Sequence, residues 1–115
     1  MSVETNVKIR RYSSGEELHG ADDTFLRRDY DLSMEIPELS LTSGVKTEIR
    51  TVLSTIEYLY IAVTGDSATI SLFQNRSPGC WQFNNCFLVI GAEDVTSFHL
   101  RADAGTTVSI YVAGT

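Results

Sequence analysis

Apolar and polar residues alternate with a period of two along much of this chain, and this alternation constrains the fold more than any other feature. Val3 to Ile9, Ala68 to Leu72 and Val108 to Val112 all show it. Successive side chains of a β-strand point to opposite faces, so such runs predict strands with one buried face. Valine, isoleucine, threonine and aromatic residues, which fit a pleated surface, are frequent in them.

Short segments of turn-forming residues separate these runs. Thr64-Gly65-Asp66 lies between the apolar run 57–63 and the alternating run 68–72, which predicts a β-hairpin. Further turns are expected at 75–79, 91–94 and 103–105. About eight or nine short strands with turn signals at this spacing are typical of an all-β, antiparallel β-sandwich or jelly roll.

One segment allows a second interpretation. Its apolar residues also fall on one face of a helix: Val45, Ile49, Val52, Leu53 and Ile56. Its content of serine and threonine and its lack of good helix formers favour strand or loop instead. The helix remains the alternative.

Length and charge limit the classes of function. The chain has 115 residues, which is the usual size of a single domain. Its net charge is −6, from 15 acidic and 9 basic residues. It has no basic patch, which argues against nucleic-acid binding. No apolar run reaches the roughly 20 residues of a membrane span. The first residues do not resemble a signal peptide, so synthesis and retention in a cytoplasm are expected.

Charge is concentrated in the first half of the chain. We expect a single domain over residues 1–115, with an N-terminal strand and charged arm or loop at 1–43 and a core scaffold at 44–115. Residues 13–31 are poor in apolar side chains and predict a long loop, either solvated or ordered against a partner. Mixed charges give selectivity at interfaces. We therefore expect partner contacts from Arg10, Arg11, Arg27, Arg28, Asp22 and Asp23.

The cysteines and histidines predict no metal or cofactor. In an extended strand Cys80 and Cys86 are about 20 Å apart, too far for a disulfide. They are expected to be two small buried apolar residues. His19 lies near Asp22 and Asp23, but the spacing matches no calcium loop.

The chain carries no recognisable catalytic motif. Gly65-Asp66-Ser67 is followed by Ala68-Thr69 instead of the glycines of a serine protease, and His99 falls on a polar strand face. The chain is therefore expected not to be an enzyme. Four aromatic residues are expected in the core or at an interface, with a sugar-stacking platform as the alternative: Trp81, Tyr58, Tyr60 and Tyr111.

Three segments share a pattern of strand and turn: Gly44–Ile49, the strands and turn from Ile56 to Leu72, and the last strand, Val108 to Gly114. In this pattern residues 44–114 resemble small virion proteins of tailed bacteriophages. The resemblance implies a non-enzymatic virion structural protein, above all a capsid decoration protein, assembled in the host cytoplasm. A head–tail connector or tail accessory protein, or a carbohydrate-binding β-sandwich module, is the alternative.

Two apolar runs also predict self-association. Residues 57–63 and 87–90 are apolar on both strand faces, more than one small sandwich hides, and sheet edges need cover. A homo-oligomer, with a trimer as the first expectation, supplies that cover. The expected partners are thus the chain itself and a viral capsid or tail protein.

Overall fold

The computed structural model describes the backbone of residues 2–7, 11–13, 16–18, 24–74, 79–95 and 97–115, and the side chains of 30–74, 79–91 and 97–115. Every regular element within these ranges is a β-strand, and all strand pairs are antiparallel. The chain divides into two compact units, Met1–Tyr30 and Asp31–Thr115.

The first unit is built from two strand pairs. β1 (Ser2–Val7) pairs with β4 (Thr24–Asp29), and β2 (Arg11–Ser13) pairs with β3 (Glu16–Leu18). Because β2 and β3 lie between β1 and β4 in the sequence, the two pairs follow the order of one hairpin. The prediction of a loop over residues 13–31 is therefore wrong at β3 and β4, which lie within that range. A two-stranded pair needs no continuous apolar face, so apolar content alone did not reveal it.

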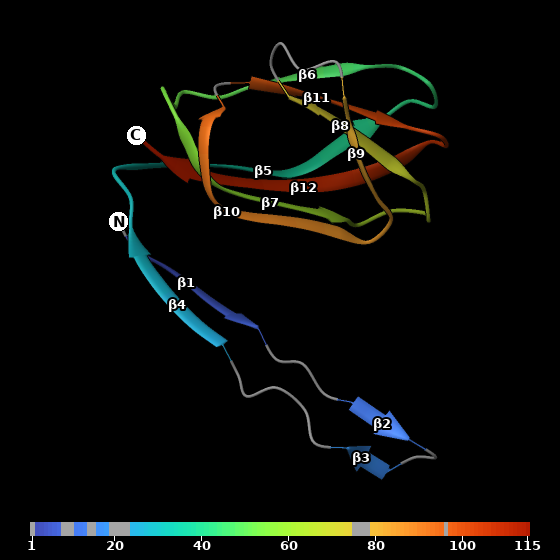
Figure 1. The fold of residues 1–115 in the computed structure, drawn as a ribbon. Coiled ribbons are helices and arrows are strands. Elements are labelled where there is room, and N and C mark those ends of the chain that lie inside the picture. The colour runs from blue at the N-terminus through green and yellow to red at the C-terminus, as the bar shows by residue number, and fades with distance from the viewer. Residues whose placement is uncertain (1, 8–10, 14–15, 19–23, 75–78, 96) are drawn as a thin grey trace. The chain divides into compact units, whose positions relative to one another are not determined.

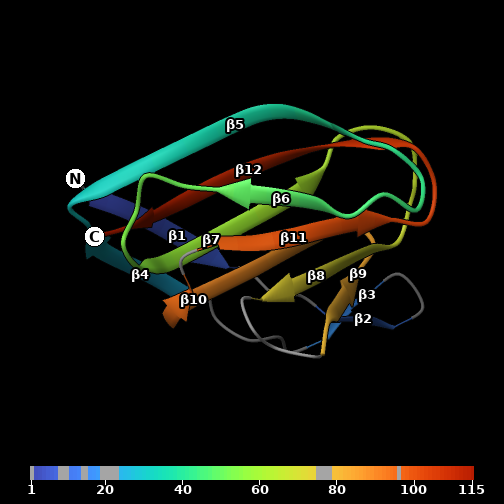
Figure 2. The same cartoon turned by 90° about the horizontal axis from the view of Figure 1, so that it is seen from above.

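The second unit is a β-sandwich of two four-stranded sheets, with strand orders β10-β7-β12-β5 and β6-β11-β8-β9. Figure 1 shows them as two layers, and Figure 2 shows the second lying over the first. Its strands are β5 (Leu32–Leu41), β6 (Thr47–Arg50), β7 (Ile56–Val63), β8 (Ile70–Gln74), β9 (Trp81–Phe83), β10 (Cys86–Val95), β11 (Ser97–Ala102) and β12 (Thr106–Gly114).

The pairing of these strands is that of an eight-stranded jelly roll. β5 pairs with β12, β6 with β11, β7 with β10 and β8 with β9, as in one long hairpin. The additional pairs β12–β7 and β11–β8 arise when that hairpin rolls up into two sheets. The predicted antiparallel sandwich of jelly-roll type is confirmed.

The predicted hairpin around Thr64-Gly65-Asp66 is wrong, because β7 and β8 lie in different sheets. The connection crosses from one sheet to the other and packs against the start of β12. Gly65 N donates to Thr107 O at 3.2 Å, and a Cβ on Gly65 would lie 2.6 Å from Thr107 Oγ1. This glycine therefore permits a close approach of two backbones.

Two further expectations differ from the structure. β5 pairs with β12 from Leu32–Gly114 to Leu41–Thr106, so the sandwich begins at residue 31 and the predicted boundary at 43/44 lies inside it. The alternative helix over 45–56 is also wrong, since β6 occupies Thr47–Arg50. Pairing with β11 supplies the backbone hydrogen bonds that a helix would have made internally.

The core fills the space between the two sheets. β12 shows how the alternation produces it, because Val108, Ile110 and Val112 are almost completely buried while Ser109 and Tyr111 between them are half-buried. Each buried aliphatic side chain contributes about 1.5–3 kcal/mol relative to exposure. The fully buried core also includes Ile56, Ile61, Ile70, Phe98, Leu100 and Ala102.

Candidate functional site

The outward side of the β10-β7-β12-β5 sheet is unusually apolar over three strands. In the register, Leu88 lies beside Tyr60, which lies beside Tyr111, and Ile90 lies beside Tyr58 in the next row. No charged residue occurs in 86–90, 58–62 or 109–113. We call this surface the outer apolar face and define it by Leu88, Ile90, Tyr58, Tyr60, Ala62, Tyr111 and Ala113.

Part of the outer apolar face is open to solvent. Leu88 and Tyr60 each keep 37% of their surface exposed, whereas Tyr58 keeps 9%. The rings of Tyr58 and Tyr111 meet edge to face, with centroids 5.8 Å apart and an angle of 80°. Such edge-to-face pairs are a favourable aromatic geometry and hold the two rings in place.

The edges of the two sheets differ in how they are protected from other chains. β5 carries Pro37 between Glu35 and Glu38, β6 is four residues long with Glu48 and Arg50, and β9 has three residues. Proline, charge and shortness each discourage pairing at an edge. The described first half of β10, residues 86–91, is uncharged and contains no proline.

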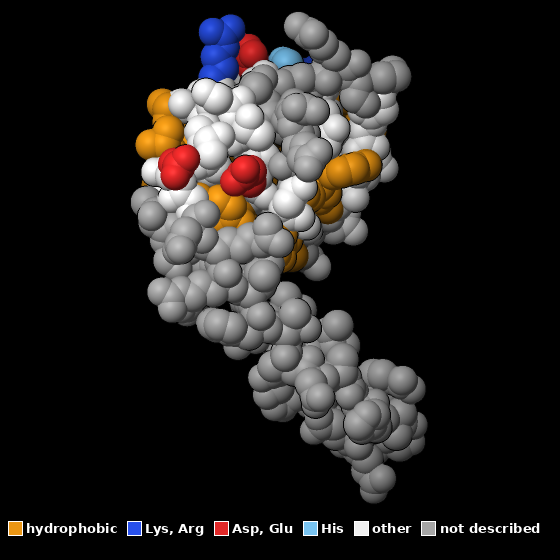
Figure 3. Space-filling model, turned by 60° about the vertical axis from the view of Figure 1, so that its left-hand side comes forward, with side chains coloured by type: hydrophobic (Ala, Val, Ile, Leu, Met, Phe, Trp, Pro, Cys, Tyr) orange, Lys and Arg blue, Asp and Glu red, His pale blue; other side chains and the backbone are white. Residues whose placement is uncertain are grey.

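The outward side of the other sheet is charged and wet. The Lys46 ammonium lies 4.3 Å and the Arg101 guanidinium 5.2 Å from the centroid of the Phe73 ring. Glu48 and Arg50 form an exposed ion pair of 3.2 Å on β6. Figure 3 shows cationic and acidic side chains gathered at this end of the sandwich. The two outer surfaces therefore suit different environments.

A polar hollow of about 300 Å³ lies at the Ala102–Asp103 end of β11. Asp103 Oδ1 accepts a hydrogen bond from Thr69 N at 2.8 Å, and Ser43 Oγ donates to Asp103 O at 2.9 Å. Gln82 Nε2 donates to Ser71 Oγ at 3.4 Å. These polar groups bond to one another, and the residues around the hollow include no histidine or cysteine: Ser43, Gly44, Thr69, Ser71, Gln82, Arg101, Ala102 and Asp103.

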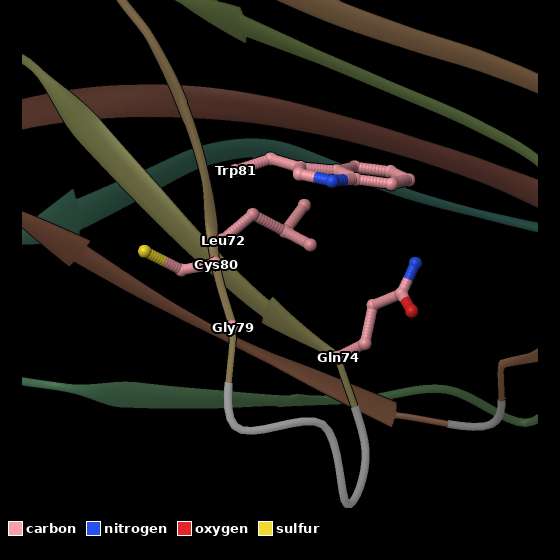
Figure 4. Close-up of a pocket in the computed structure, with 5 residues that line it drawn as sticks. All are labelled: Leu72, Gln74, Gly79, Cys80 and Trp81. Atoms are coloured by element: carbon pink, nitrogen blue, oxygen red, sulfur yellow. The ribbon is translucent and has the colours of Figure 1, made fainter.

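A second hollow, of about 190 Å³, lies beside Trp81. Figure 4 shows Trp81, Leu72 and Gln74 projecting to one side of β8 and β9, while the Cys80 side chain points away. Trp81 is half-exposed, and its ring centroid lies 5.2 Å from that of Phe87. The residues around this hollow are few and include both polar and apolar side chains. Among the described residues there, no two groups are suited to acid–base catalysis.

The structure separates Trp81 from the other residues predicted for sugar stacking, because Tyr58, Tyr60 and Tyr111 lie in the other sheet. Trp81 is paired with the core residue Leu72 and therefore lies on the inward side of its sheet. Tyr60 belongs to the outer apolar face of the other sheet, and Tyr58 is buried there. A flat platform made of all four rings is absent from the described residues.

The residues predicted to contact a partner fall in the first unit. Arg11 lies in β2, and Arg27 and Arg28 lie in β4 at the register positions of Glu4 and Val3. The remaining three, Arg10, Asp22 and Asp23, and also His19, lie outside the described residues. Their contact with a partner stays a prediction.

Both cysteines are free thiols, but both are exposed, so the expectation that they are buried is wrong. Cys86 begins an edge strand on the outward side, next to Ala62. Cys80 precedes β9, where the chain enters its sheet. His99 is half-buried on the charged outer side, at the register position of Glu48. Sequence alternation predicted this side for His99 correctly.

Within the described ranges, no three histidine, cysteine or acidic side chains gather as metal ligands. The same ranges contain no helix of the length and apolar character needed to span a membrane. Comparison of the chain with protein-family models, curated proteins and solved structures finds no match.

Proposed function

We propose that this chain is a non-enzymatic structural protein of a bacteriophage virion, and that it decorates and stabilises the capsid. The virion assignment is argued from the resemblance expected from the sequence of residues 44–114, and it is compatible with the jelly roll, an architecture that viral capsid domains use. The observation that carries a structural role is the outer apolar face.

The outer apolar face supports assembly with another protein surface. It spans three strands without a charge, and Leu88 and Tyr60 within it are more than one-third exposed. Contiguous apolar patches on a soluble domain mark interaction sites, and tyrosines are enriched in the centres of such interfaces. A polar ligand would make few favourable contacts with these apolar side chains. The fitting partner is therefore a protein surface that is itself apolar.

The absence of a catalytic role is supported by the two hollows. In the polar hollow, Asp103 is engaged by Thr69, and Ser71 accepts from Gln82. A nucleophile needs a base beside it and a base needs an orienting group, and neither arrangement occurs among the residues around either hollow.

The first unit is proposed to contact the capsid or tail protein. It forms a compact unit of its own, and its strands carry charges of both signs, as in the register pair Glu4–Arg27. Individually, surface charges contribute about 0–1 kcal/mol. Repetition on a lattice multiplies such weak contacts, so many copies can attach firmly.

The test is the composition of virions from a phage that encodes the chain. Mass spectrometry of purified particles should detect the chain at many copies per virion. Added full-length chain should bind particles assembled without it, and cryo-electron microscopy should place it on the outer shell. A chain absent from purified virions overturns the proposal, and density confined to the tail replaces decoration with a tail role.

Binding to particles also tests which surface is used. Tyr60→Glu introduces a charge into the outer apolar face and should reduce the amount bound. Thr42→Glu is the matched control, because Thr42 is exposed and lies beyond the end of β5. Equal binding by both variants would remove the outer apolar face from the capsid contact.

A further inference from the structure

We propose that two copies of this chain pair through the open edge of β10, in antiparallel orientation, with Leu88 opposite Leu88 of the second copy. The proposal takes up the self-association expected from the sequence and adds its surface, register and symmetry. It does not depend on the location in a virion.

The first argument is the direction of the backbone groups in β10. Val63 N donates to Asn85 O at 2.9 Å, so the carbonyl of Asn85 points toward β7. In a strand, the N–H and C=O groups of one residue share a side, and that side alternates along the chain. The backbone groups of Cys86, Leu88 and Ile90 therefore point to the open side, where no strand of the described residues pairs with them.

The second argument is the contrast among the edges. Pairing with another chain is discouraged at β5, β6 and β9 by a proline, by charged residues or by the short length of the strand. β10 has neither charge nor proline over residues 86–91; its two acidic residues, Glu93 and Asp94, and the irregularity in its register with β7 lie beyond Ile90. An uncharged edge with free backbone groups is a template for another strand, and an unguarded one in a soluble protein is expected to be occupied.

The third argument is that this edge is complementary to itself. A two-fold axis through Leu88 places Cys86 opposite Ile90 of the second copy and Phe87 opposite Val89. In this register outward residues meet outward residues, and inward residues meet inward ones. Every cross-strand pair is uncharged, and no glutamate or lysine is forced against a like charge.

The fourth argument is continuity with neighbouring apolar surface. Leu88 lies beside Tyr60 on the outer apolar face, and the two sheets join with these faces on one side. On the inward side, Phe87 contacts Trp81, which is 49% exposed. The contact therefore extends beyond the two strands. Such a pairing is isologous and closes at two copies, in place of the trimer expected from the sequence.

The experiment begins with the mass of the full chain in solution, measured by light scattering over a range of concentrations. Two copies are expected. Leu88→Lys places a charge opposite its own copy and should weaken the dimer by about tenfold or more. Ser40→Lys on the opposite edge strand, β5, is the matched control and should leave the dimer unchanged.

Cross-linking tests the register independently of any loss of folding. Residues opposite each other in a hydrogen-bonded antiparallel pair have Cα atoms about 5.5 Å apart, and their side chains lie within reach of a short linker that reacts with two thiols. Leu88→Cys, with Cys80→Ser and Cys86→Ser, should therefore give a covalently linked dimer when treated with such a linker. Ser40→Cys in the same background should not.

Three results would overturn the pairing: a monomer at every concentration, a mass of three copies, or a dimer in which Leu88→Cys forms no cross-link. None of these bears on whether the chain is found in virions, so failure of the pairing is distinguishable from failure of the proposed function. A dimer with the expected cross-link establishes the surface and the register together.

Discussion

At the scale of single residues, Gly65 shows how a side chain's absence supports the fold. The 64–69 connection passes close to β12, and a Cβ at Gly65 would lie 2.8 Å from Thr107 N as well as near its hydroxyl. Gly65→Ala should destabilise the sandwich by about 1–3 kcal/mol. Calorimetry should record a lower Tm, by about 4–8 °C per kcal/mol for a domain of this size.

Gly105→Ala is the matched control for that substitution. The nearest atom to a Cβ there is Leu41 O at 3.9 Å, an ordinary contact, and Gly105 is not in a left-handed conformation. Its Tm should change little or rise slightly, since alanine restricts the unfolded chain. An equal loss of Tm in the two variants would show that the close approach to Thr107 does not explain the loss at Gly65.

Thr106 makes a second residue-scale contact between β12 and the same connection. Its hydroxyl donates to Asp66 O at 2.6 Å, and the side chain keeps only 8% of its surface exposed. Thr106→Val keeps the shape but removes the donor, and should cost about 1 kcal/mol in chemical denaturation.

Thr107→Val serves as its comparison. The Thr107 hydroxyl pairs with that of Thr64 at 3.1 Å in an exposed position, where water can replace the partner. A loss smaller than that of Thr106→Val is expected. If Thr107→Val were the more destabilising, the buried hydrogen bond to Asp66 would not be the stronger link.

At the scale of elements, β12 should be the strand on which the sandwich depends most. It pairs with β5 on one side and with β7 on the other, and Ile110 at its centre is 1% exposed. Ile110→Ala should cost about 2–5 kcal/mol in the free energy of unfolding, through lost burial and the cavity left behind. Chemical denaturation followed by Trp81 fluorescence gives this value.

The control for Ile110 is its neighbour Ser109, which faces outward from the same strand. Ser109→Ala removes a hydroxyl that is only half-buried and should change stability by less than about 0.5 kcal/mol. A similar loss at both positions would contradict the alternation of inward and outward residues along β12.

The strands themselves were predictable from local pattern, whereas their partners were not. The alternation in 108–112 correctly assigned the inward and outward residues of β12, and the polar face expected for His99 is the outward side of β11. The same pattern around Thr64-Gly65-Asp66 predicted a hairpin, although β7 and β8 lie in different sheets. Local alternation defines which side of a strand is buried, but pairing depends on residues far away in the chain.

The outer apolar face was also predictable only in part from the sequence. That residues 57–63 and 87–90 are apolar on both sides is visible in the sequence, and it led to the expectation of a covered second face. That Leu88, Tyr60 and Tyr111 lie in one row follows only from the order β10-β7-β12. The exposure of Cys86 was missed because an edge position is a property of the sheet and not of the strand.

At the scale of the whole molecule, the two units should be separable. All strand pairs in the described residues lie within one unit, with β1 to β4 in the first and β5 to β12 in the second. A chain lacking residues 2–29 therefore keeps both sheets of the sandwich. Its thermal melt should stay cooperative, and its far-ultraviolet circular dichroism should remain that of a β-protein.

A smaller deletion, residues 13–31 replaced by a short glycine–serine bridge, gives the informative comparison. It removes β3 and β4 and so leaves β1 and β2 without their partners, and it also removes Asp31, whose N–H donates to Gly114 O at 3.1 Å. An isolated unpaired strand is prone to associate with other edges. We expect this deletion to keep a folded sandwich but to aggregate more than the chain lacking 2–29, while both lose binding to capsid particles.

Light scattering during a thermal ramp, beside the particle-binding assay, measures both effects. A collapse of the Tm in the chain lacking 2–29 would show that the first unit belongs to the folding core, and undiminished particle binding would show that it is not the contact.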